Sequence, residues 1–325
     1  MRLALENPSP LSRVVRYLKE HPTVPLAILL LILVGLLQVI RPGIVNDRWI
    51  GNTIRFAAPL AMLAACQTLT MLTGGIDLSV GVVATITGYV LATQAPIVGV
   101  PTAVVIALIP ALLIGLVNGF GVAICRVHPL IMTLGTGLIA TGCLQVYQRF
   151  VIATGVQFPD FLVWLASGRT GSFPNVLVLI IPFAALIVWG QRRSGFGRLL
   201  YAIGSNERAA QLSGVHPWQV YMLLYALSGL IAGLAGFLDL GLIKTASLSL
   251  AMPLVLPSVA AAVIGGTSIF GGRGGYGGTI IGALILTVLT TLLTLLQMPE
   301  GARRMLFGLI ILAVTALYAR LTDQN

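Results

Sequence analysis

The chain has 325 residues, of which 57% are hydrophobic and 9% are charged, and its mean hydropathy is +0.99. This composition excludes an ordinary soluble domain, in which about a quarter of the residues are charged, and it predicts that most of the chain is buried in lipid. The net charge of +10 would suggest nucleic acid as the partner of a soluble protein. In a membrane protein it indicates basic residues beside the spans, so the lipid bilayer and not nucleic acid is the expected partner.

Apolar runs of about 20 residues, the length that crosses a bilayer, recur along the chain. They predict an all-α polytopic membrane protein of about ten transmembrane helices, folded as a single domain over residues 1–325. Residues 1–22 are predicted to form an interfacial segment on the cytoplasmic side, and a short helix from Phe161 to Ala166 is expected on the outer face. The spans are expected at about 24–40, 53–72, 78–95, 101–124, 130–152, 174–190, 218–242, 254–270, 276–297 and 302–319.

The second span ends in the segment LTGGIDLSVG, residues 72–81. Gly74 and Gly75 allow backbone conformations that other residues avoid, so we expect the helix to break there. Asp77 is placed to cap the next helix, which is predicted to begin at Leu78. Because a carboxylate at mid-bilayer costs about 2.5–3.5 kcal/mol on insertion scales, Asp77 has three open interpretations. It caps a break, lies on the path of a substrate or coupling ion, or carries a proton.

A similar pattern occurs in the second half of the chain. The segment VIGGTSIFGGRGGYGGTIIGAL, residues 263–284, also runs from an apolar helix into a glycine pair, Gly265 and Gly266. A short polar break and a new helix follow. Paired interrupted segments in two halves indicate interrupted helices, an internal repeat and a transport pathway built from that repeat.

A few polar side chains fall inside the predicted spans. Each either makes a hydrogen bond between helices or lines a pathway, and as a set they suit a polar, uncharged solute better than an ion. They are Gln67, Thr70, Asn118, Thr133, Thr136 and Gln145, with the carboxylate of Asp239 near the end of the seventh span. The predicted pathway residues are Gln67, Thr70, Gly74, Gly75, Asp77, Asn118, Thr133, Thr136, Gly265 and Gly266.

The stretch 191–217 is polar and basic, although apolar spans lie on both sides of it. Its Ser-Gly-Phe-Gly sequence predicts a turn, and LLYAI predicts one short buried helix. Ser205 and Asn206 are predicted to cap a second helix, from Glu207 to Leu212, because their side chains can accept from an unpaired N–H. Gly214 ends that helix, since glycine tolerates the left-handed conformation that follows many helix ends.

Ten spans place both termini on the same side of the membrane. With the N-terminus inside, the inner segments contain 11 Lys and Arg residues and the outer segments contain 8. By the positive-inside rule this difference favours cytoplasmic termini. The 191–217 segment is then cytoplasmic as well.

The sequence contains few residues or motifs that are typical of enzyme active sites. His21, His128 and His216 each precede a proline at the edge of a span, and the three cysteines lack metal-ligand spacing. No P-loop is present, because GGRGGYGG lacks the lysine that contacts phosphates. We therefore expect no cofactor, no metal and no catalytic residue, and we expect any ATP hydrolysis on a separate subunit.

Four blocks occur in order: LTGGIDLSVG, GLVNGFGVAICRVHPLIMTLGT at 115–136, FGRLLYAIGSNERAAQLSGV at 196–215, and VIGGTSIFGGRGGYGGTIIGAL. Together they resemble the ribose-type inner-membrane permeases of binding-protein-dependent ABC importers, over most of the chain after about residue 52. The resemblance implies a bacterial inner-membrane importer for a monosaccharide or similar polar solute. It implies as partners two ATPase subunits, a periplasmic substrate-binding protein and a second permease chain. The implied ATPase contacts are Phe196, Gly197, Arg198, Asn206, Glu207, Ala209, Ala210, Ser213 and Gly214.

Two departures from the family pattern affect what can be carried over. Gln67 stands where members often have an acidic residue, and Val255 and Pro257 stand where acidic residues are common. Without those charges, the family's substrate preference and gating contacts do not carry over to this chain. The departures fit a chain that works beside a second, non-identical permease, and the second permease chain is expected to be the same or a homologous one. The alternative function is an ion-coupled secondary transporter of a small polar solute, with Asp77 or Asp239 as the coupling group. An intramembrane enzyme would need a nucleophile and base, or a metal cluster, which we cannot assemble.

Overall fold

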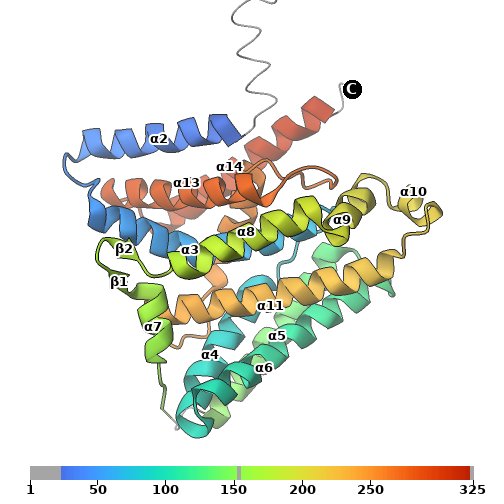
Figure 1. Cartoon of the computed structure of the whole chain (residues 1–325), viewed down its shortest axis with the longest axis horizontal. Coiled ribbons are helices and arrows are strands. Elements are labelled where there is room, and N and C mark those ends of the chain that lie inside the picture. Colours follow the sequence, from blue (N-terminus) through green and yellow to red (C-terminus); the bar gives the residue numbers. More distant parts are fainter. Residues whose placement is uncertain (1–22, 152–154, 323–325) are drawn as a thin grey trace, which may run out of the picture.

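The computed structural model describes residues 23–151 and 155–322, and the predicted all-α fold is confirmed (Figure 1). The predicted interfacial segment, residues 1–22, lies outside the described residues. The helices are α2 (Thr23–Ile40), α3 (Asp47–Met71), α4 (Val80–Val98), α5 (Val100–Ala123), α6 (Pro129–Val151), α7 (Asp160–Ser167), α8 (Leu177–Arg193), α9 (Gly195–Ser205), α10 (Glu207–Leu212), α11 (Pro217–Ile243), α12 (Val255–Ile264), α13 (Tyr276–Leu295) and α14 (Glu300–Thr322). A 3₁₀ helix, η1 (Met252–Leu254), precedes α12, and strands β1 (Arg169–Thr170) and β2 (Phe173–Pro174) form an antiparallel hairpin.

Within the described residues, seven helices are long and apolar enough to cross a membrane, and α8 with α9, bent by 63°, makes an eighth if the two count as one span. These lie where the apolar runs predict spans, and α14 covers the last predicted span. The run at 254–270 does not form one spanning helix. α12 has ten residues, which is about 15 Å of helix, whereas the hydrocarbon core is about 30 Å thick. The chain leaves this helix at Gly266, whose φ is +87°.

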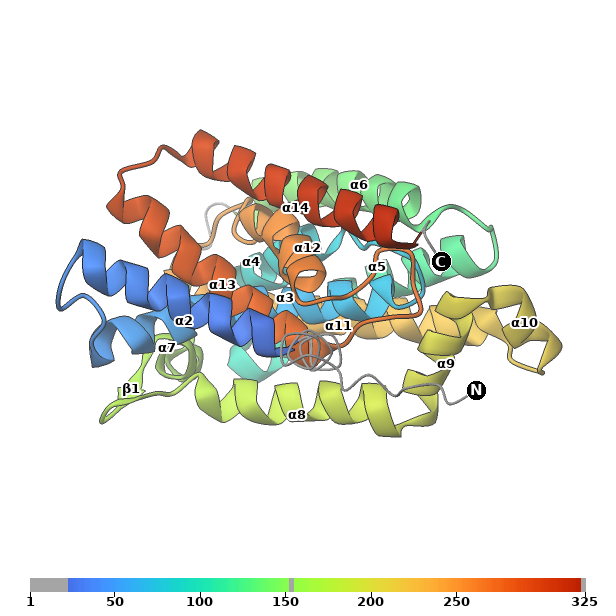
Figure 2. The same ribbon diagram turned by 90° about the horizontal axis from the view of Figure 1, so that it is seen from above.

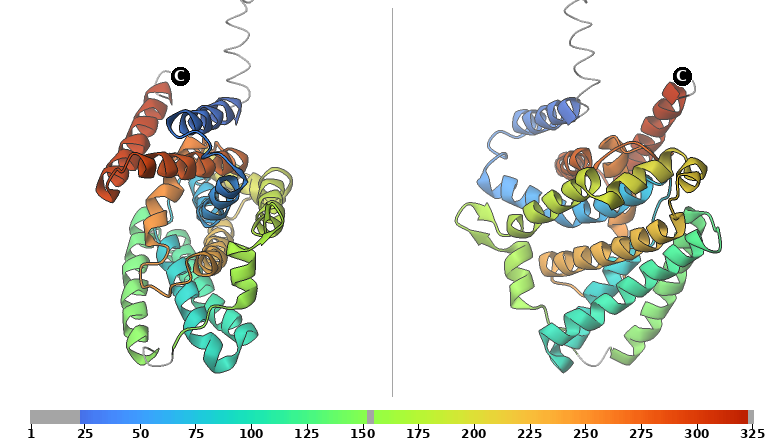
Figure 3. Two further views of the ribbon diagram at one scale, coloured as in Figure 1. Left: turned by 90° about the vertical axis from the view of Figure 1, so that its left-hand side faces the viewer. Right: turned by 45° about the vertical axis from the view of Figure 1, so that its right-hand side comes forward.

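The helices lie in layers, as Figures 1 and 3 show. α2, α13 and α14 form one flank, α4, α5 and α6 form the opposite flank, and α3, α11 and α12 lie between them. α11 packs against α3, α4 and α5, and α3 also packs against α12 and α13. Of the residues in the most apolar part of each helix, 83% are buried in α3, 83% in α4 and 72% in α11, against 17% in α6. α3, α4 and α11 are therefore the most buried of the long helices.

Close packing at the centre depends on glycines of α11, in the small-residue motif SGLIAGLAGFL at residues 228–238. A Cβ on Gly229 would lie 2.3 Å from the carbonyl oxygen of Ala111 in α5. A Cβ on Gly236 would lie 2.0 Å from the carbonyl oxygen of Ala84 in α4. The backbones of α4, α5 and α11 thus approach one another more closely than any larger residue would permit.

The hairpin and α7 lie at one end of the bundle, and α9 and α10 lie at the other (Figure 2). We call these the hairpin end and the α10 end. The helix predicted at 161–166 is confirmed as α7. Arg55 of α3 donates to the carbonyl of Ser167, and Nη2 of Arg169 donates to the carbonyl of Asp47 at 3.2 Å. These bonds fix the beginning of α3 to the hairpin end.

Candidate functional site

The end of α8 from Gln191, together with α9 and α10, forms most of the polar segment that the sequence predicts over 191–217. The predicted Ser-Gly-Phe-Gly turn is wrong, because Ser194 is the N-cap of α9 and its hydroxyl accepts from the N–H of Gly197 at 2.9 Å. The helix then continues from Gly195 to Ser205. The predicted LLYAI helix is thus the middle of a longer helix whose Leu200 is fully buried.

α10 is capped at both ends, as the sequence predicts. Oδ1 of Asn206 accepts from the N–H of Ala209 at 2.9 Å. At the other end Gly214 has a φ of +85°. The N–H groups of Gly214 and Val215 donate to carbonyls of the last turn at 3.0 and 3.1 Å, which is the Schellman pattern. A helix of only six residues is therefore held in shape by its own termini.

Most side chains of α10 point away from the bundle. Leu212 is 85% exposed and Ala209 is exposed, whereas Ala210 is 6% exposed and packs inward. Glu207 accepts from the hydroxyl of Tyr221 in α11 at 3.1 Å, which holds α10 to α11. The prediction named Ala209 but not Leu212, which is the most exposed large apolar side chain of this helix.

The other predicted contact residues lie in the first turn of α9. Phe196 is half-buried and packs against the core. A Cβ on Gly197 would lie 2.3 Å from the carbonyl oxygen of Gln191, so this glycine lets α9 fold back against α8. Arg198 is exposed and donates to the carbonyl of Arg193 at 3.3 Å. Of the three predicted residues, Arg198 is the one that projects into solvent.

The two predicted helix breaks have the same backbone turn. Gly74 has a φ of +78° and Gly266 a φ of +87°. In each case this glycine and the next residue donate to carbonyls of the preceding turn, at distances of 2.9–3.0 Å. The similar sequences of the two breaks therefore form similar turns. The turning glycine is the first of the pair in the first break and the second of the pair in the second break. Gly75 and Gly265 are packing positions instead: a Cβ would lie 2.8 Å from the hydroxyl of Tyr225 and 2.4 Å from the backbone of α13, respectively.

Both breaks meet the end of α9. The N–H of Gly272, in the second break, donates to the carbonyl of Leu72, in the first, at 2.9 Å. Gly204 lies against this hydrogen bond, since a Cβ there would be 1.8 Å from the oxygen of Leu72 and 2.6 Å from the nitrogen of Gly272. A Cβ on Gly271 would lie 2.7 Å from the carbonyl oxygen of Gly204. We call these four residues the α9 junction.

Asp77 is 1% exposed, and its carboxylate accepts three hydrogen bonds. The N–H and hydroxyl of Ser79 donate to one oxygen at 3.0 and 2.6 Å, and the hydroxyl of Ser228 donates to the other at 2.7 Å. α4 begins at Val80 with Ser79 as its N-cap residue. The prediction that Asp77 caps a helix from Leu78 is therefore wrong, and the carboxylate instead binds the turn that precedes α4.

Gln67 ties this turn to α3. Its Nε2 donates to the carbonyl of Asp77 at 2.8 Å, and its Oε1 accepts from the N–H of Asp77 at 3.3 Å. This contact needs both a donor and an acceptor. An ionised carboxylate at this position could only accept. The amide at Gln67 thus fits the local geometry of this chain.

Three further predicted residues continue the network from α5 and α6. Nδ2 of Asn118 donates to the hydroxyl of Ser79 at 2.9 Å, and Oδ1 accepts from the hydroxyl of Thr136 at 2.5 Å. The hydroxyl of Thr133 contacts the backbone on both sides of Asp77, at 3.1 and 3.0 Å. The predicted polar residues thus converge on the first break from α3, α5 and α6.

Three of the predicted polar residues lie outside this network. Gln145 is exposed. Thr70 donates to carbonyls of its own helix. Asp239 is 3% exposed, and its Oδ2 has no hydrogen-bond partner among the described residues. No group of three or more His, Cys, Asp or Glu within 23–151 and 155–322 is placed to hold a metal ion.

The network is closed and buried, so in this conformation it holds the first break in place. A role for its members in translocation stays a prediction. Sequence reasoning missed Ser79 and Ser228, which bind the carboxylate. Ser228 is the first residue of the small-residue motif in α11, and a hydroxyl at that depth in a span is the signal that could have found it.

Comparison with known proteins identifies the family. Residues 49–315 match the family described as branched-chain amino acid transport system / permease component. The chain belongs to this permease family. It is 35% identical to the ribose import permease protein RbsC of Escherichia coli (strain K12), over 92% of each chain.

Two other relatives show how far the similarity extends. The chain is 35% identical to the galactofuranose transporter permease protein YtfT of Escherichia coli (strain K12), over 79% of this chain and 76% of the relative. It is 30% identical to the fructose import permease protein FrcC of Rhizobium meliloti, over 94% and 88%. No solved structure matches the chain. The resemblance to ribose-type ABC permeases is confirmed, and the chain is a multi-pass inner-membrane protein.

Proposed function

We propose that this chain is the permease subunit of an ATP-driven importer that moves a monosaccharide or similar polar solute across the bacterial inner membrane. One observation carries the proposal. α10 is a short helix, capped at both ends, whose side chains mostly point away from the bundle, and the helix before it makes backbone contact with both interrupted helices. The relatives named for transport of ribose, galactofuranose and fructose support a sugar as the solute.

The α10 end then faces the cytoplasm, where one of the two ATPase subunits docks on α10 through Ala209, Leu212 and the capped ends of the helix, and the other docks on the second permease chain. Exposed arginines on this segment agree with the positive-inside rule. Both chain termini are cytoplasmic in this orientation. The hairpin end faces the periplasm, where a binding protein delivers the solute.

Transport follows from the α9 junction. Closure of the ATPases on ATP moves α10 and with it α9. Because Gly204 contacts the backbone of both breaks, α3 and α12 must move together when α9 moves. A second permease chain, identical or homologous, supplies the other half of the pathway, and the two bundles rock between outward-open and inward-open states.

The hydrogen bonds of Asp77 favour this proposal over an ion-coupled carrier that uses Asp77 as its coupling group. Its carboxylate is occupied by Ser79 and Ser228, whereas a coupling group needs a site that an ion or a proton can enter and leave. The carboxylate of Asp77 instead acts as a structural hydrogen-bond acceptor.

Uptake by cells that express the whole transporter tests the proposal. Replacement of the catalytic glutamate of the ATPase by glutamine should abolish uptake, and an ionophore at constant ATP should leave uptake unchanged. Uptake that survives the ATPase substitution and collapses with the ionophore would establish the ion-coupled alternative.

A further inference from the structure

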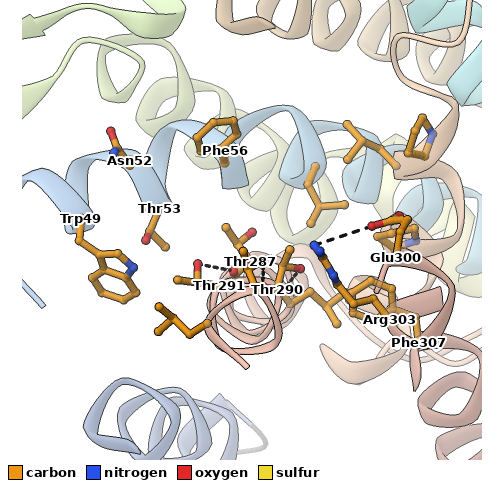
Figure 4. Close-up of a pocket in the computed structure, with 17 residues that line it drawn as sticks. Trp49, Asn52, Thr53, Phe56, Thr287, Thr290, Thr291, Glu300, Arg303 and Phe307 are labelled. Atoms are coloured by element: carbon orange, nitrogen blue, oxygen red, sulfur yellow. Dashed lines mark hydrogen bonds and ion pairs between the residues drawn. The ribbon is translucent and has the colours of Figure 1, made fainter. Parts of the chain in front are cut away.

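A cavity of about 450 Å³ opens between α3, α12, α13 and α14, outside the network described above. Its volume lies in the range of about 300–1,000 Å³ that is typical of small-molecule sites. Figure 4 shows Trp49 at one end, Glu300 and Arg303 at the other, and threonines of α13 between them. The cavity thus combines aromatic rings with hydroxyl and charged groups.

The aromatic side chains supply flat apolar surfaces. Trp49 and Phe56 come from α3, and Phe307 comes from α14. The C–H face of a sugar ring is apolar, and it can pack on such rings while its hydroxyl groups reach polar side chains at the edges. The lining is mostly apolar with a few polar groups, which is the usual composition of a site that orients a small molecule.

The indole N–H of Trp49 is the most specific feature of the cavity. Its nitrogen is buried and has no acceptor among the described residues. Figure 4 shows the nitrogen on the side of the ring that faces the α13 threonines. A buried donor without an acceptor is unfavourable, and a hydroxyl oxygen of a bound molecule would satisfy it.

The threonines of α13 offer acceptors on the same face. The hydroxyls of Thr287, Thr290, Thr291 and Thr294 each donate to a carbonyl of their own helix, at 2.7–3.2 Å. Their hydrogens are therefore used, and their oxygens keep lone pairs that can accept from a ligand. A molecule with several hydroxyl groups, which both donate and accept, matches this combination.

The cavity lies toward the hairpin end. Its α3 residues begin at Trp49, close to Asp47, whose carbonyl is bound by Arg169 of the hairpin. The opposite end of α3 reaches the α9 junction. If α10 faces the cytoplasm, the cavity therefore opens on the periplasmic side, where a solute arrives.

We propose that this cavity binds the transported solute as it enters the permease, and that the solute is a monosaccharide-sized polyol. The inference rests on the proposed function, which sets the orientation and the solute class. Trp49 donates its indole N–H to a solute hydroxyl, and Thr291 accepts from another. The rings of Trp49 and Phe56 pack against the apolar face of the solute.

Thiol accessibility in membranes that contain the whole transporter tests the proposal directly. Thr294, at the exposed end of the threonine row, is replaced by cysteine after the exposed Cys125 and Cys143 have been changed to alanine. A charged, membrane-impermeant methanethiosulfonate should modify T294C. D-ribose, D-fructose or D-galactose should slow this modification in a concentration-dependent way.

Two variants and two matched controls then locate the site. W49F keeps a ring but loses the N–H, and T291V keeps the shape but loses the oxygen. Each should raise the half-protecting sugar concentration by about two- to tenfold, the range for one lost hydrogen bond. W189F changes an exposed tryptophan of α8, and T141V changes a threonine of α6 with the same bond to its own helix. Neither control should shift protection.

The outcomes separate this proposal from the proposed function. If T294C is not modified, or if none of the three sugars protects it, the cavity is not the solute site. Equal shifts in the variants and the controls would overturn it as well. If uptake still depends on the ATPase in those cases, the proposed importer function stands. If uptake is independent of the ATPase, the proposed importer function is refuted.

Discussion

Replacement of Gly204 by alanine should damage the α9 junction. The added Cβ would lie 1.8 Å from the carbonyl oxygen of Leu72 and must retreat by about 1.6 Å to reach ordinary contact at 3.4 Å. Neither that oxygen nor the nitrogen of Gly272 can swing away, because both are backbone atoms that bond each other. Overpacking of this kind costs about 1–3 kcal/mol, against a gain of about 1 kcal/mol from alanine in a helix. We expect a net loss of up to about 2 kcal/mol.

The assay compares Gly204→Ala with Gly190→Ala in the purified transporter. Gly190 also lies in a helix, and a Cβ there meets nothing within 4 Å, so its replacement should be neutral or slightly stabilising. Gly204→Ala should lower the thermal midpoint of the permease by several degrees relative to this control. It should also raise the amount of ATP hydrolysed per solute imported, because α9 no longer contacts both breaks. Equal midpoints and equal coupling in the two variants would refute the role of the junction.

Three further predictions concern α10 and the buried carboxylates. Gly214→Ala places a side chain in the left-handed region at a cost of about 1–2 kcal/mol and should uncouple ATP hydrolysis from uptake; Gly171→Ala, equally left-handed in the hairpin, should keep coupling. Ser228→Ala removes a hydrogen bond to the buried carboxyl group of Asp77 and should destabilise the permease by about 0.5–3 kcal/mol; equal thermal midpoints in the variant and the parent would show that this bond is unimportant. Asp239→Asn should leave the thermal midpoint unchanged or raise it, because a carboxylate oxygen without a partner is replaced by a neutral amide, whereas Asp77→Asn should lower it.

Local features of the α10 segment could be predicted because they depend on neighbouring residues. Asn206 caps α10 and Gly214 ends it, as expected, since each acts on N–H or C=O groups within a few positions. The Ser-Gly-Phe-Gly turn was a wrong prediction for a related reason. Ser194 is equally able to begin a helix, and the choice depended on Gly197 packing against α8, which is a tertiary contact.

The buried polar residues were predictable as a set but not as a network. Gln67, Asn118 and Thr136 stand out because polar side chains are rare inside spans. Their partners come from other helices, and hydropathy carries no information on which helices are neighbours. The two glycine pairs were also aligned one residue out of register. The sequence shows that two glycines are adjacent, but only the backbone φ angles show which of the two turns the chain.

The length of α12 was overestimated because an apolar run does not show where a helix stops. Residues 254–270 are apolar enough for a span, but Gly265 packs against the backbone of α13 and Gly266 adopts a left-handed conformation. A short helix that ends inside the bundle leaves its terminal carbonyls to be satisfied locally, and the turn at Gly266 does this with two hydrogen bonds at 3.0 and 2.9 Å. The backbone groups at this interruption thus find partners inside the protein, and none needs to be exposed to lipid.

α3 connects the two ends of the permease. Its 25 residues span about 38 Å, from the cavity wall at Trp49 to the α9 junction just beyond Met71. A displacement of α9 that moves the first break therefore also moves one wall of the cavity, unless α3 bends. Pro59, which lies inside α3, removes one backbone hydrogen bond there and is the position at which bending is easiest. Pro59→Ala should make α3 stiffer. Sugar protection of T294C should then differ more between the ATP-bound and the nucleotide-free transporter than it does without Pro59→Ala. An equal difference with and without Pro59→Ala would show that α3 does not transmit the motion.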